Sequence, residues 1–185
     1  MKVLVVWSSV TGNTEKIARA AARGCPGARV CSVDKAPDPA GFGPVFLAFW
    51  CDKGEIDANS LAYLGRIRDA AKAKGTPIDV AFFGTMGGEP ESERARQWLQ
   101  RKVAEQAGAG ELIRPIGARL WQGRIDPRVV ERMKRVMPMP PERLARIEAA
   151  ASHPDAQDER QAAQWAAGIL QAYAEERESV PQGEV

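Results

Sequence analysis

Short apolar runs alternate with helical patterns along most of this chain, and that alternation constrains the fold more than any other feature. Runs rich in Val, Ile, Leu and Phe predict strands at 2–7, 28–33, 44–50, 78–84 and 112–120. These runs do not alternate cleanly between apolar and polar residues, which is typical of strands buried on both faces. Strands separated by helices indicate a parallel sheet covered on both sides by right-handed crossovers. The predicted fold class is therefore α/β, with a doubly wound five-stranded parallel sheet.

Helical patterns with well-defined ends separate the strands and continue after the last one. Helices are predicted at 14–23, 59–74, 92–107, 126–136, 141–151 and from 155 onward. Gly24 and Gly75 end the first two helices, and Asp126-Pro127 supplies an N-cap and first-turn pair for the fourth. With 185 residues the chain is long enough for one domain with a buried core. We place that domain at residues 1–178, followed by a frayed tail at 179–185.

Composition argues against several classes of protein and site. The longest apolar runs, at 3–7 and 45–50, have the length of strands, so no membrane span is expected. Three cysteines and a single histidine show no metal-ligand spacing, so no metal site is expected either. Because an odd number of cysteines cannot all pair within the chain, a reducing cytoplasm is the expected location.

The net charge of +2 conceals an asymmetry along the chain. Residues 114–148 contain nine Lys or Arg against four Asp or Glu, whereas residues 154–185 contain two against seven. A basic stretch suggests nucleic-acid binding, but these charges alternate with apolar residues at helical spacing, as on solvated helix faces. No aromatic-plus-basic or groove-entering motif accompanies them, so we expect no nucleic-acid partner.

The loop between the first strand and the first helix is rich in hydrogen-bonding groups. Residues 8–14 read SSVTGNT and combine four hydroxyls, an amide, a glycine and a row of backbone N–H groups. In an open parallel sheet, ligands bind beyond the carboxyl ends of the strands, where a helix N-terminus attracts anions. We expect Ser9, Thr11, Asn13 and Thr14 to surround a phosphate, with Gly12 allowing close approach. A polar helix cap without a ligand is the alternative.

Two common phosphate-binding motifs are excluded, because the loop has no lysine for a Walker motif and lacks the three spaced glycines of a dinucleotide fingerprint. The stretch Ser9-Val10-Thr11-Gly12-Asn13-Thr14 resembles the phosphate loop of the flavodoxin family, Ser/Thr-x-Thr-Gly-x-Thr, which binds the monophosphate of FMN. The resemblance covers residues 1–120. It implies a strand order of 2-1-3-4-5 and FMN as the cofactor. Residues 126–153 depart from the family pattern, because they form an extra helical segment that minimal flavodoxins lack.

The resemblance also implies two further flavin loops, of which the first follows the third strand. It consists of Trp50, Cys51, Asp52, Lys53 and Gly54. Trp50 resembles the aromatic residue that stacks on the flavin ring, and closing the core at a strand end is its alternative role. Cys51 stands where flavodoxins commonly have a glycine whose peptide flips to hydrogen-bond flavin N5. Because a non-glycine residue resists positive φ, we expect a costlier flip here, unless Gly54 takes it over.

The other flavin loop follows the fourth strand and consists of Thr85, Met86, Gly87 and Gly88. The resemblance implies that this glycine-rich loop turns backbone N–H groups toward the pyrimidine edge of the flavin. Many flavodoxins stack a tyrosine on the second face of the ring, and this chain has none at that place. Met86 either replaces the tyrosine or is a plain packing residue.

The resemblance implies an electron-transfer protein that passes electrons between redox partner proteins. No residue set suits hydrolysis or acyl transfer, so no catalytic residue is expected apart from the flavin. The alternative is an FMN-dependent reductase of a small molecule such as a quinone or tetrapyrrole; enzyme activity and a homodimer both stay open. A receiver domain phosphorylated on Asp52 is disfavoured, because the acidic metal ligands it needs after the first strand are missing. The pI of about 8.5 departs from that of acidic flavodoxins and indicates a different docking partner.

Overall fold

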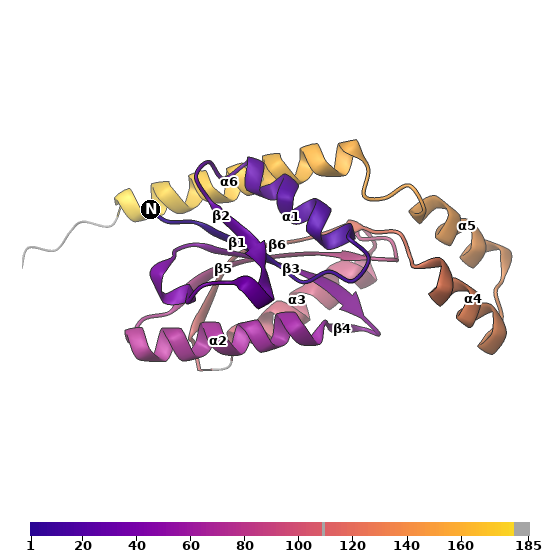
Figure 1. The fold of residues 1–185 in the computed structure, drawn as a ribbon, viewed down its shortest axis with the longest axis horizontal. Helices are drawn as coiled ribbons and strands as arrows, with labels where there is room; N and C mark the ends of the chain where they lie inside the picture. The colour runs from indigo at the N-terminus through magenta and orange to yellow at the C-terminus, as the bar shows by residue number, and fades with distance from the viewer. Residues whose placement is uncertain (109, 180–185) are drawn as a thin grey trace, which may run out of the picture.

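A parallel sheet forms the centre of the computed structural model, which describes residues 1–108 and 110–179 (Figure 1). The strands are β1 (Leu4–Trp7), β2 (Arg29–Ser32), β3 (Val45–Asp52), β4 (Glu55–Ile56), β5 (Ile78–Met86) and β6 (Ile113–Gln122). Their order in the sheet is β2-β1-β3-β5-β6, and the short β4 pairs antiparallel with the end of β3. The predicted order 2-1-3-4-5 is thus confirmed for the five parallel strands.

Helices cover both faces of this sheet. In the described ranges they are α1 (Asn13–Arg23), α2 (Ala58–Lys74), α3 (Glu93–Ala107), α4 (Pro127–Val136), α5 (Pro141–Ala150) and α6 (Ala156–Ser179), with 3-10 turns at 33–35 and 39–41. Helices α1 and α6 pack on one face and α2 and α3 on the other, while α4 and α5 stand beyond one end (Figure 1). Ser179 belongs to α6 rather than to the predicted frayed tail, whose residues 180–185 lie outside the described residues.

Side-chain caps account for the start of several helices. The carboxylates of Asp57 and Asp126 and the hydroxyl of Ser92 each accept a backbone N–H bond in the first turn of α2, α4 and α3, respectively. Gly75 ends α2 with a φ of 71°, a left-handed conformation that glycine adopts without steric cost. The end of α2 at Gly75 and the start of α4 after Asp126 are confirmed, whereas the Asp57 cap was not predicted.

The central strands bury side chains on both faces, which is why their sequences are apolar throughout. On one face, Leu47 and Phe82 pack with Leu64 and Leu99 under α2 and α3. On the opposite face, strand residues pack against the small residues of α1 and against α6. The sheet therefore separates two hydrophobic cores and contributes side chains to both.

An aromatic cluster holds α6 on the second face. Trp165 of α6 lies with its ring centroid 6.1 Å from Phe46, 5.5 Å from Phe83 and 5.7 Å from Trp121. Aromatic contacts of this kind contribute about 0.5–1.5 kcal/mol beyond the burial of apolar area. The last helix is thus part of the core and not an appendage.

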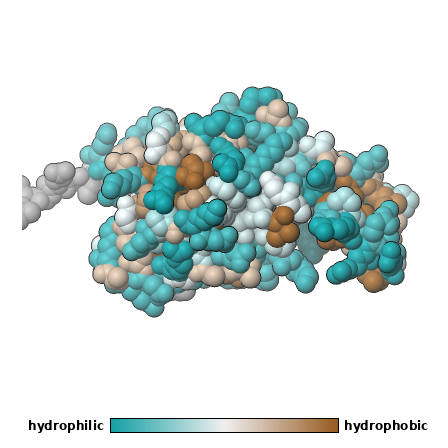
Figure 2. All heavy atoms as spheres, in the orientation of Figure 1, coloured by the Kyte–Doolittle hydropathy of each residue, from teal (hydrophilic) through white to brown (hydrophobic). Residues whose placement is uncertain are grey.

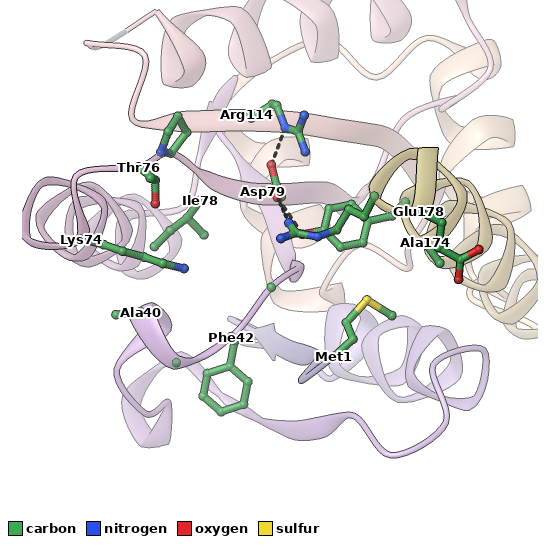
Figure 3. A pocket seen from close by; sticks show the side chains of 15 residues that line it. Met1, Ala40, Phe42, Lys74, Thr76, Ile78, Asp79, Arg114, Ala174 and Glu178 are labelled. Carbon is green, nitrogen blue, oxygen red and sulfur yellow. Dashed lines mark hydrogen bonds and ion pairs between the residues drawn. The ribbon is translucent and has the colours of Figure 1, made fainter. Parts of the chain in front are cut away.

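A charged cluster closes the amino ends of the strands (Figure 3). Asp79 on β5 is buried; it accepts bonds from Arg114 on β6 and, at 2.7 Å, from the hydroxyl of Tyr173 on α6. Burial and the Asp79 carboxylate together raise the pKa of Tyr173. The cluster borders a cavity of about 940 Å³ that is also lined by Phe42 and Lys74. These bonds tie α6 to the sheet at the edge opposite the loops predicted to bind a ligand.

The close approach of α6 to the end of α1 generates a prediction about stability. A Cβ on Gly24 would collide with the backbone carbonyl of Ala163 and would lie 2.9 Å from the backbone nitrogen of Ala167. Because Gly24 has an ordinary φ of −80°, alanine fits its backbone and the cost is steric alone. We expect Gly24→Ala to lower the free energy of unfolding by about 1–3 kcal/mol in urea titrations.

Gly168→Ala is the matched control for this prediction, because a Cβ there meets no atom within 4 Å and the residue lies inside α6. It should be neutral or stabilise the protein by up to about 1 kcal/mol. Equal destabilisation by both substitutions would contradict the packing of α6 on α1.

Candidate functional site

Three loops meet at the carboxyl edge of the sheet. The first follows β1, the second is the turn between β3 and β4, and the third follows β5. The hydroxyls of Thr14 and Thr85 lie 2.8 Å apart and are buried, so they join the first loop to the end of β5. In the strand register Trp50 on β3 is the partner of Thr85, which brings the second loop next to the same bond. The tertiary structure thus gathers residues from all three predicted loops.

The first loop presents unused hydrogen-bond donors at the N-terminus of α1. Gly12 has a φ of 88°, and its N–H donates to the Ser9 hydroxyl at 3.1 Å. The backbone N–H groups of Val10, Thr11 and Asn13 carry no hydrogen bond to any residue in the described ranges. Val10 is 72% exposed and Thr11 is also exposed, so this part of the loop lies at the surface. Such a row of N–H groups at a helix N-terminus suits an anion.

Three of the four side chains expected around the phosphate have partners within the protein, although the Ser9 hydroxyl, which accepts the Gly12 N–H, can still donate its own proton. The Thr14 hydroxyl is bonded to Thr85, and the Asn13 amide nitrogen donates to the carbonyl of Arg124 at 2.8 Å. Both bonds join residues far apart in the chain, which sequence spacing could not reveal. The groups left to face a ligand are the backbone N–H groups and the hydroxyls of Ser9 and Thr11.

The second loop is a tight β-hairpin. Lys53 and Gly54 form its two-residue turn with φ values of 51° and 88°, and the flanking pairs are Asp52 with Glu55 and Cys51 with Ile56. Two successive positive φ values are the signature of a type I′ turn, which matches the twist of the paired strands. Cys51 therefore lies in extended strand, and the left-handed positions fall at Lys53 and Gly54.

Asp57 fixes the base of this hairpin. Its N–H donates to the Trp50 carbonyl at 3.1 Å, and its carboxylate accepts the Trp50 N–H at 3.2 Å. The same carboxylate caps α2 by accepting the Ser60 N–H. Sequence analysis missed this residue, although an aspartate directly before a helical pattern is a recognisable N-cap signal.

Helix α3 holds the tip of the hairpin. The Trp98 indole N–H donates to the Gly54 carbonyl at 2.7 Å. Lys102, which is buried, binds Glu55 at 2.6 Å and Glu105 at 2.9 Å, and these carboxylates raise the pKa of its ammonium group. The turn is thereby fixed between two helices.

Trp50 carries a polar group without a partner. Its side chain is half-buried, and its indole N–H is buried yet bonded to no residue of the described chain. The accessible part of Trp50 is therefore its ring surface, which stands at the end of β3 next to Thr85 in the strand register. Together with the N–H groups of the first loop, this aromatic surface fits a ligand that has both a planar ring and a phosphate.

The third loop is packed against the segment that follows β6. Strand β5 continues two residues past its predicted end, and the Met86 carbonyl accepts the Gly123 N–H at 2.8 Å. A Cβ on Gly87 would collide with the side chain of Ile125, whereas one on Gly88 would meet only the flexible Met86 end at 3.2 Å. A side chain at Gly87 would therefore force Ile125 to move, a constraint that the glycine pattern alone did not indicate.

Cys51 is not arranged as a nucleophile. Burial is the main cause that raises the pKa of its thiol, and it outweighs the Gly54 N–H, which lowers that pKa. The carboxylates of Asp52 and Glu55 raise the pKa to a smaller extent, and Lys102 lowers it least. A neutral thiol is thus the form expected near neutral pH.

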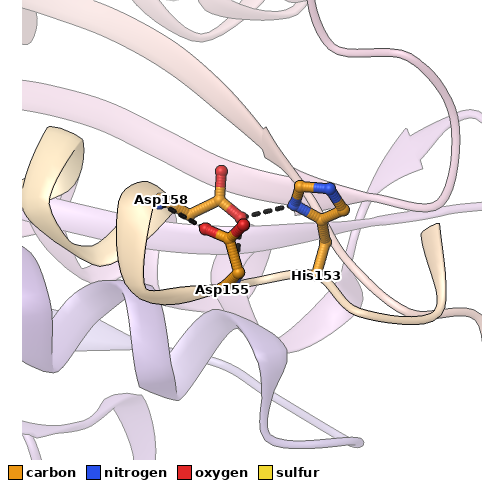
Figure 4. Close-up of side chains that lie close together, drawn as sticks. All are labelled: His153, Asp155 and Asp158. Atoms are coloured by element: carbon orange, nitrogen blue, oxygen red, sulfur yellow. Dashed lines mark hydrogen bonds and ion pairs between the residues drawn. The ribbon is translucent and has the colours of Figure 1, made fainter. Parts of the chain in front are cut away.

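A second polar cluster lies at the start of α6 (Figure 4). His153 Nδ1 lies 2.6 Å from Asp158, and ligand atoms of His153, Asp155 and Asp158 lie within 4.8 Å of one another. Asp155 and Asp158 each accept the other's backbone N–H, which is a reciprocal helix cap. These backbone bonds and nearby His153 lower the pKa of Asp155. Capping accounts for this cluster.

Across the described residues, no helix is both long enough and apolar enough to cross a bilayer.

Comparisons with known proteins agree on one family. A family model described as a flavodoxin domain matches residues 4–167. The flavodoxin-like domain-containing protein BilS of Clostridioides difficile is 28% identical over 181 residues, covering 92% of this chain and 97% of BilS.

Solved structures of low sequence identity share the fold. A WrbA-like flavodoxin from Agrobacterium tumefaciens has a TM-score of 0.61 at 12% identity, covering 94% of this chain and 98% of its own. A flavodoxin from Archaea has a TM-score of 0.59 at 14% identity, covering 94% and 99%. A Lactobacillus acidophilus flavoprotein, solved in complex with FMN, has a TM-score of 0.51 at 13% identity, covering 72% and 98%.

The bond from Trp98 to the hairpin turn generates a prediction about local stability. Trp98→Phe keeps a ring near Phe49, whose centroid lies 6.2 Å from that of Trp98, but removes the donor to Gly54. A typical hydrogen bond contributes about 1 kcal/mol, so hydrogen exchange of the Asp57 amide should become about fivefold faster. Gln97→Ala, which removes a bond to Glu93 on the exposed side of α3, should leave that rate unchanged. Unchanged exchange in Trp98→Phe would show that α3 does not hold the turn.

Proposed function

The chain belongs to the flavodoxin family, and from that premise we propose that it binds FMN at the carboxyl edge of its sheet and carries electrons between redox partner proteins. The observation that carries this proposal is the first loop, whose unpaired N–H groups lie at the start of α1. An FMN phosphate satisfies these donors and gains from the helix dipole. The absence of a dinucleotide fingerprint favours FMN over FAD.

The other two loops supply contacts suited to an isoalloxazine ring. Trp50 offers a partly exposed aromatic surface next to Thr85 in the strand register. The β3–β4 turn, fixed by Trp98 and Asp57, orients this wall of the site. We assign the phosphate to Ser9–Thr14, with Thr14 acting through its bond to Thr85, and the ring to residues 50–54 and 85–88.

Electron transfer fits the residues at this edge better than catalysis by the protein itself. When bound, FMN supplies the redox chemistry, and the protein binds, orients and tunes it. The Cys51 thiol has a raised pKa, and His153 is engaged with Asp158. The three cysteines are free thiols, which supports a place in the reducing cytoplasm.

Replacement of Thr11 tests the phosphate site. Thr11→Ala removes an exposed hydroxyl that has no partner among the described residues, so its effect on folding should be small. A hydrogen bond to a charged group contributes about 1.5–3 kcal/mol, so the Kd for FMN should rise at least about tenfold. The Kd for riboflavin, which lacks the phosphate, should not change.

Val10→Ala is the control for this prediction, because it alters the neighbouring side chain without removing a hydroxyl. If Thr11→Ala weakened the binding of FMN and of riboflavin equally, the phosphate would not be bound by Thr11 and would have to lie elsewhere. Mass spectrometry of the cofactor released by acid should give FMN, and finding FAD would overturn the assignment.

Anaerobic kinetics separate an electron carrier from a reductase. The FMN-loaded protein should exchange electrons rapidly with another redox protein. It should show no steady-state oxidation of NADPH with a quinone as acceptor. Turnover of the quinone by the isolated protein would replace the carrier function with the reductase alternative.

A further inference from the structure

Helices α4 and α5 form a hairpin that contributes almost nothing to the core. No residue of α4 is buried, and in α5 only Ala150 is. Figure 1 shows the hairpin standing apart from the sheet and from α6. Short helices in water depend on packing of an apolar face for their stability. A hairpin of this kind therefore has a face available to another molecule.

The hairpin carries apolar side chains at helical spacing. They are Val129, Met133, Val136 and Met137 on α4 or at its end, and Leu144 and Ile147 on α5. Val136 is 72% exposed, Val129 48% and Leu144 40%. Figure 2 shows apolar residues among hydrophilic ones at this end of the molecule.

The segment that precedes the hairpin, residues 123–125, contacts the candidate FMN site directly. The backbone carbonyl of Arg124, which precedes α4, accepts a hydrogen bond from the side-chain amide of Asn13 in the first loop. Gly123 donates to Met86 at the end of β5, and the Ile125 side chain lies against Gly87. A molecule held by the hairpin is thus held beside the loops assigned to FMN.

The hairpin is also basic. Residues 127–150 contain six Lys or Arg and three Glu. Arg128 and Lys134 pair with Asp126 and Glu131, respectively. The remaining cations on α4 and α5, namely Arg132, Arg135, Arg143 and Arg146, form no ion pair with any residue that the structure describes. Unpaired exposed cations attract an acidic surface and accelerate its association.

We propose that the α4–α5 hairpin is the docking surface for an acidic electron-carrier protein, an inference that rests on the proposed function. Carboxylates of the partner meet the unpaired arginines, and an apolar patch of the partner covers Val129, Val136 and Leu144. Docking there places the partner beside the FMN site. In each encounter one electron leaves a reduced centre of the partner and reduces the bound FMN, so the partner is oxidised by one electron.

Charge and composition favour this occupant over two others. A symmetric dimer through the hairpin would bring two basic surfaces together, which is unfavourable. A membrane surface attracts basic amphipathic helices, but the apolar face of such helices is rich in Trp, Phe and Leu, and Leu144 is the single leucine at 127–150. Residues 127–150 contain no Trp, Tyr or Phe.

The experiment uses the full-length, FMN-loaded protein and a reduced acidic ferredoxin with [4Fe–4S] clusters as the probe. The second-order rate of FMN reduction is followed by anaerobic stopped flow at low and high salt. Arg132→Gln/Arg135→Gln removes two unpaired cations from α4. We expect its rate to fall about tenfold at low salt and to approach the wild-type rate at high salt.

Lys72→Gln/Lys74→Gln removes the same charge from the last turn of α2, at the opposite edge of the sheet. This control should retain most of the wild-type rate. Val136→Ser tests the apolar contact and should slow the reaction at both salt concentrations. Its matched control is Leu61→Ser, which changes an exposed apolar residue on α2 and should leave the rate of FMN reduction unchanged.

The docking proposal is overturned if the two double variants slow equally or if neither does. It is also overturned if the wild type is reduced by dithionite but not by the ferredoxin. Two other results would also overturn it. Hairpin-dependent binding to phosphatidylglycerol vesicles, without hairpin-dependent reduction of FMN by ferredoxin, would assign the surface to a membrane. A hairpin-dependent dimer in sedimentation would assign it to a second copy of the chain. Failure of the proposed function is a separate result, because it shows as a protein that does not bind FMN at all.

Discussion

Parallel pairing of β1, β3 and β5 places three carboxyl ends at one edge of the sheet, and the rest of the candidate site depends on that constraint. The buried bond between Thr14 and Thr85 secures it, because the first turn of α1 is thereby fixed to the end of β5. Removing either hydroxyl would leave the other buried without its partner. The position of the donor-rich loop relative to Trp50 follows from this bond and from the strand register.

Rigidity is the second property of this edge. The turn after β3 has its left-handed residues at Lys53 and Gly54, and both its tip and its base are bonded to helices. Cys51, in contrast, is held in extended strand by its pairing with Ile56. The left-handed backbone of this segment therefore lies at the turn, and not directly after Trp50. Trp98 fixes that turn by its bond to Gly54.

The charge asymmetry of the chain becomes a spatial asymmetry in the fold. The acidic residues of α6 are partly used within the molecule, since Glu159 binds Lys16 and Arg23. Several arginines of the α4–α5 hairpin have no carboxylate partner among residues 1–108 and 110–179, and their helices lie outside both cores. Net charge alone does not show this, because opposite contributions nearly cancel over the whole chain.

Local patterns in the sequence determined the five parallel strands, most helix ends and the donor-rich loop, because periodicity, caps and glycine punctuation act over a few neighbouring residues. They also indicated the family and hence the strand order, but they did not predict the short β4. Only the tertiary structure decided how Asn13 is used, which side chain packs against Gly87, and which residue holds Gly54. Each of these depends on a partner 38 or more positions away in the chain. Such contacts form only when the sheet has brought their elements together, so no local pattern encodes them.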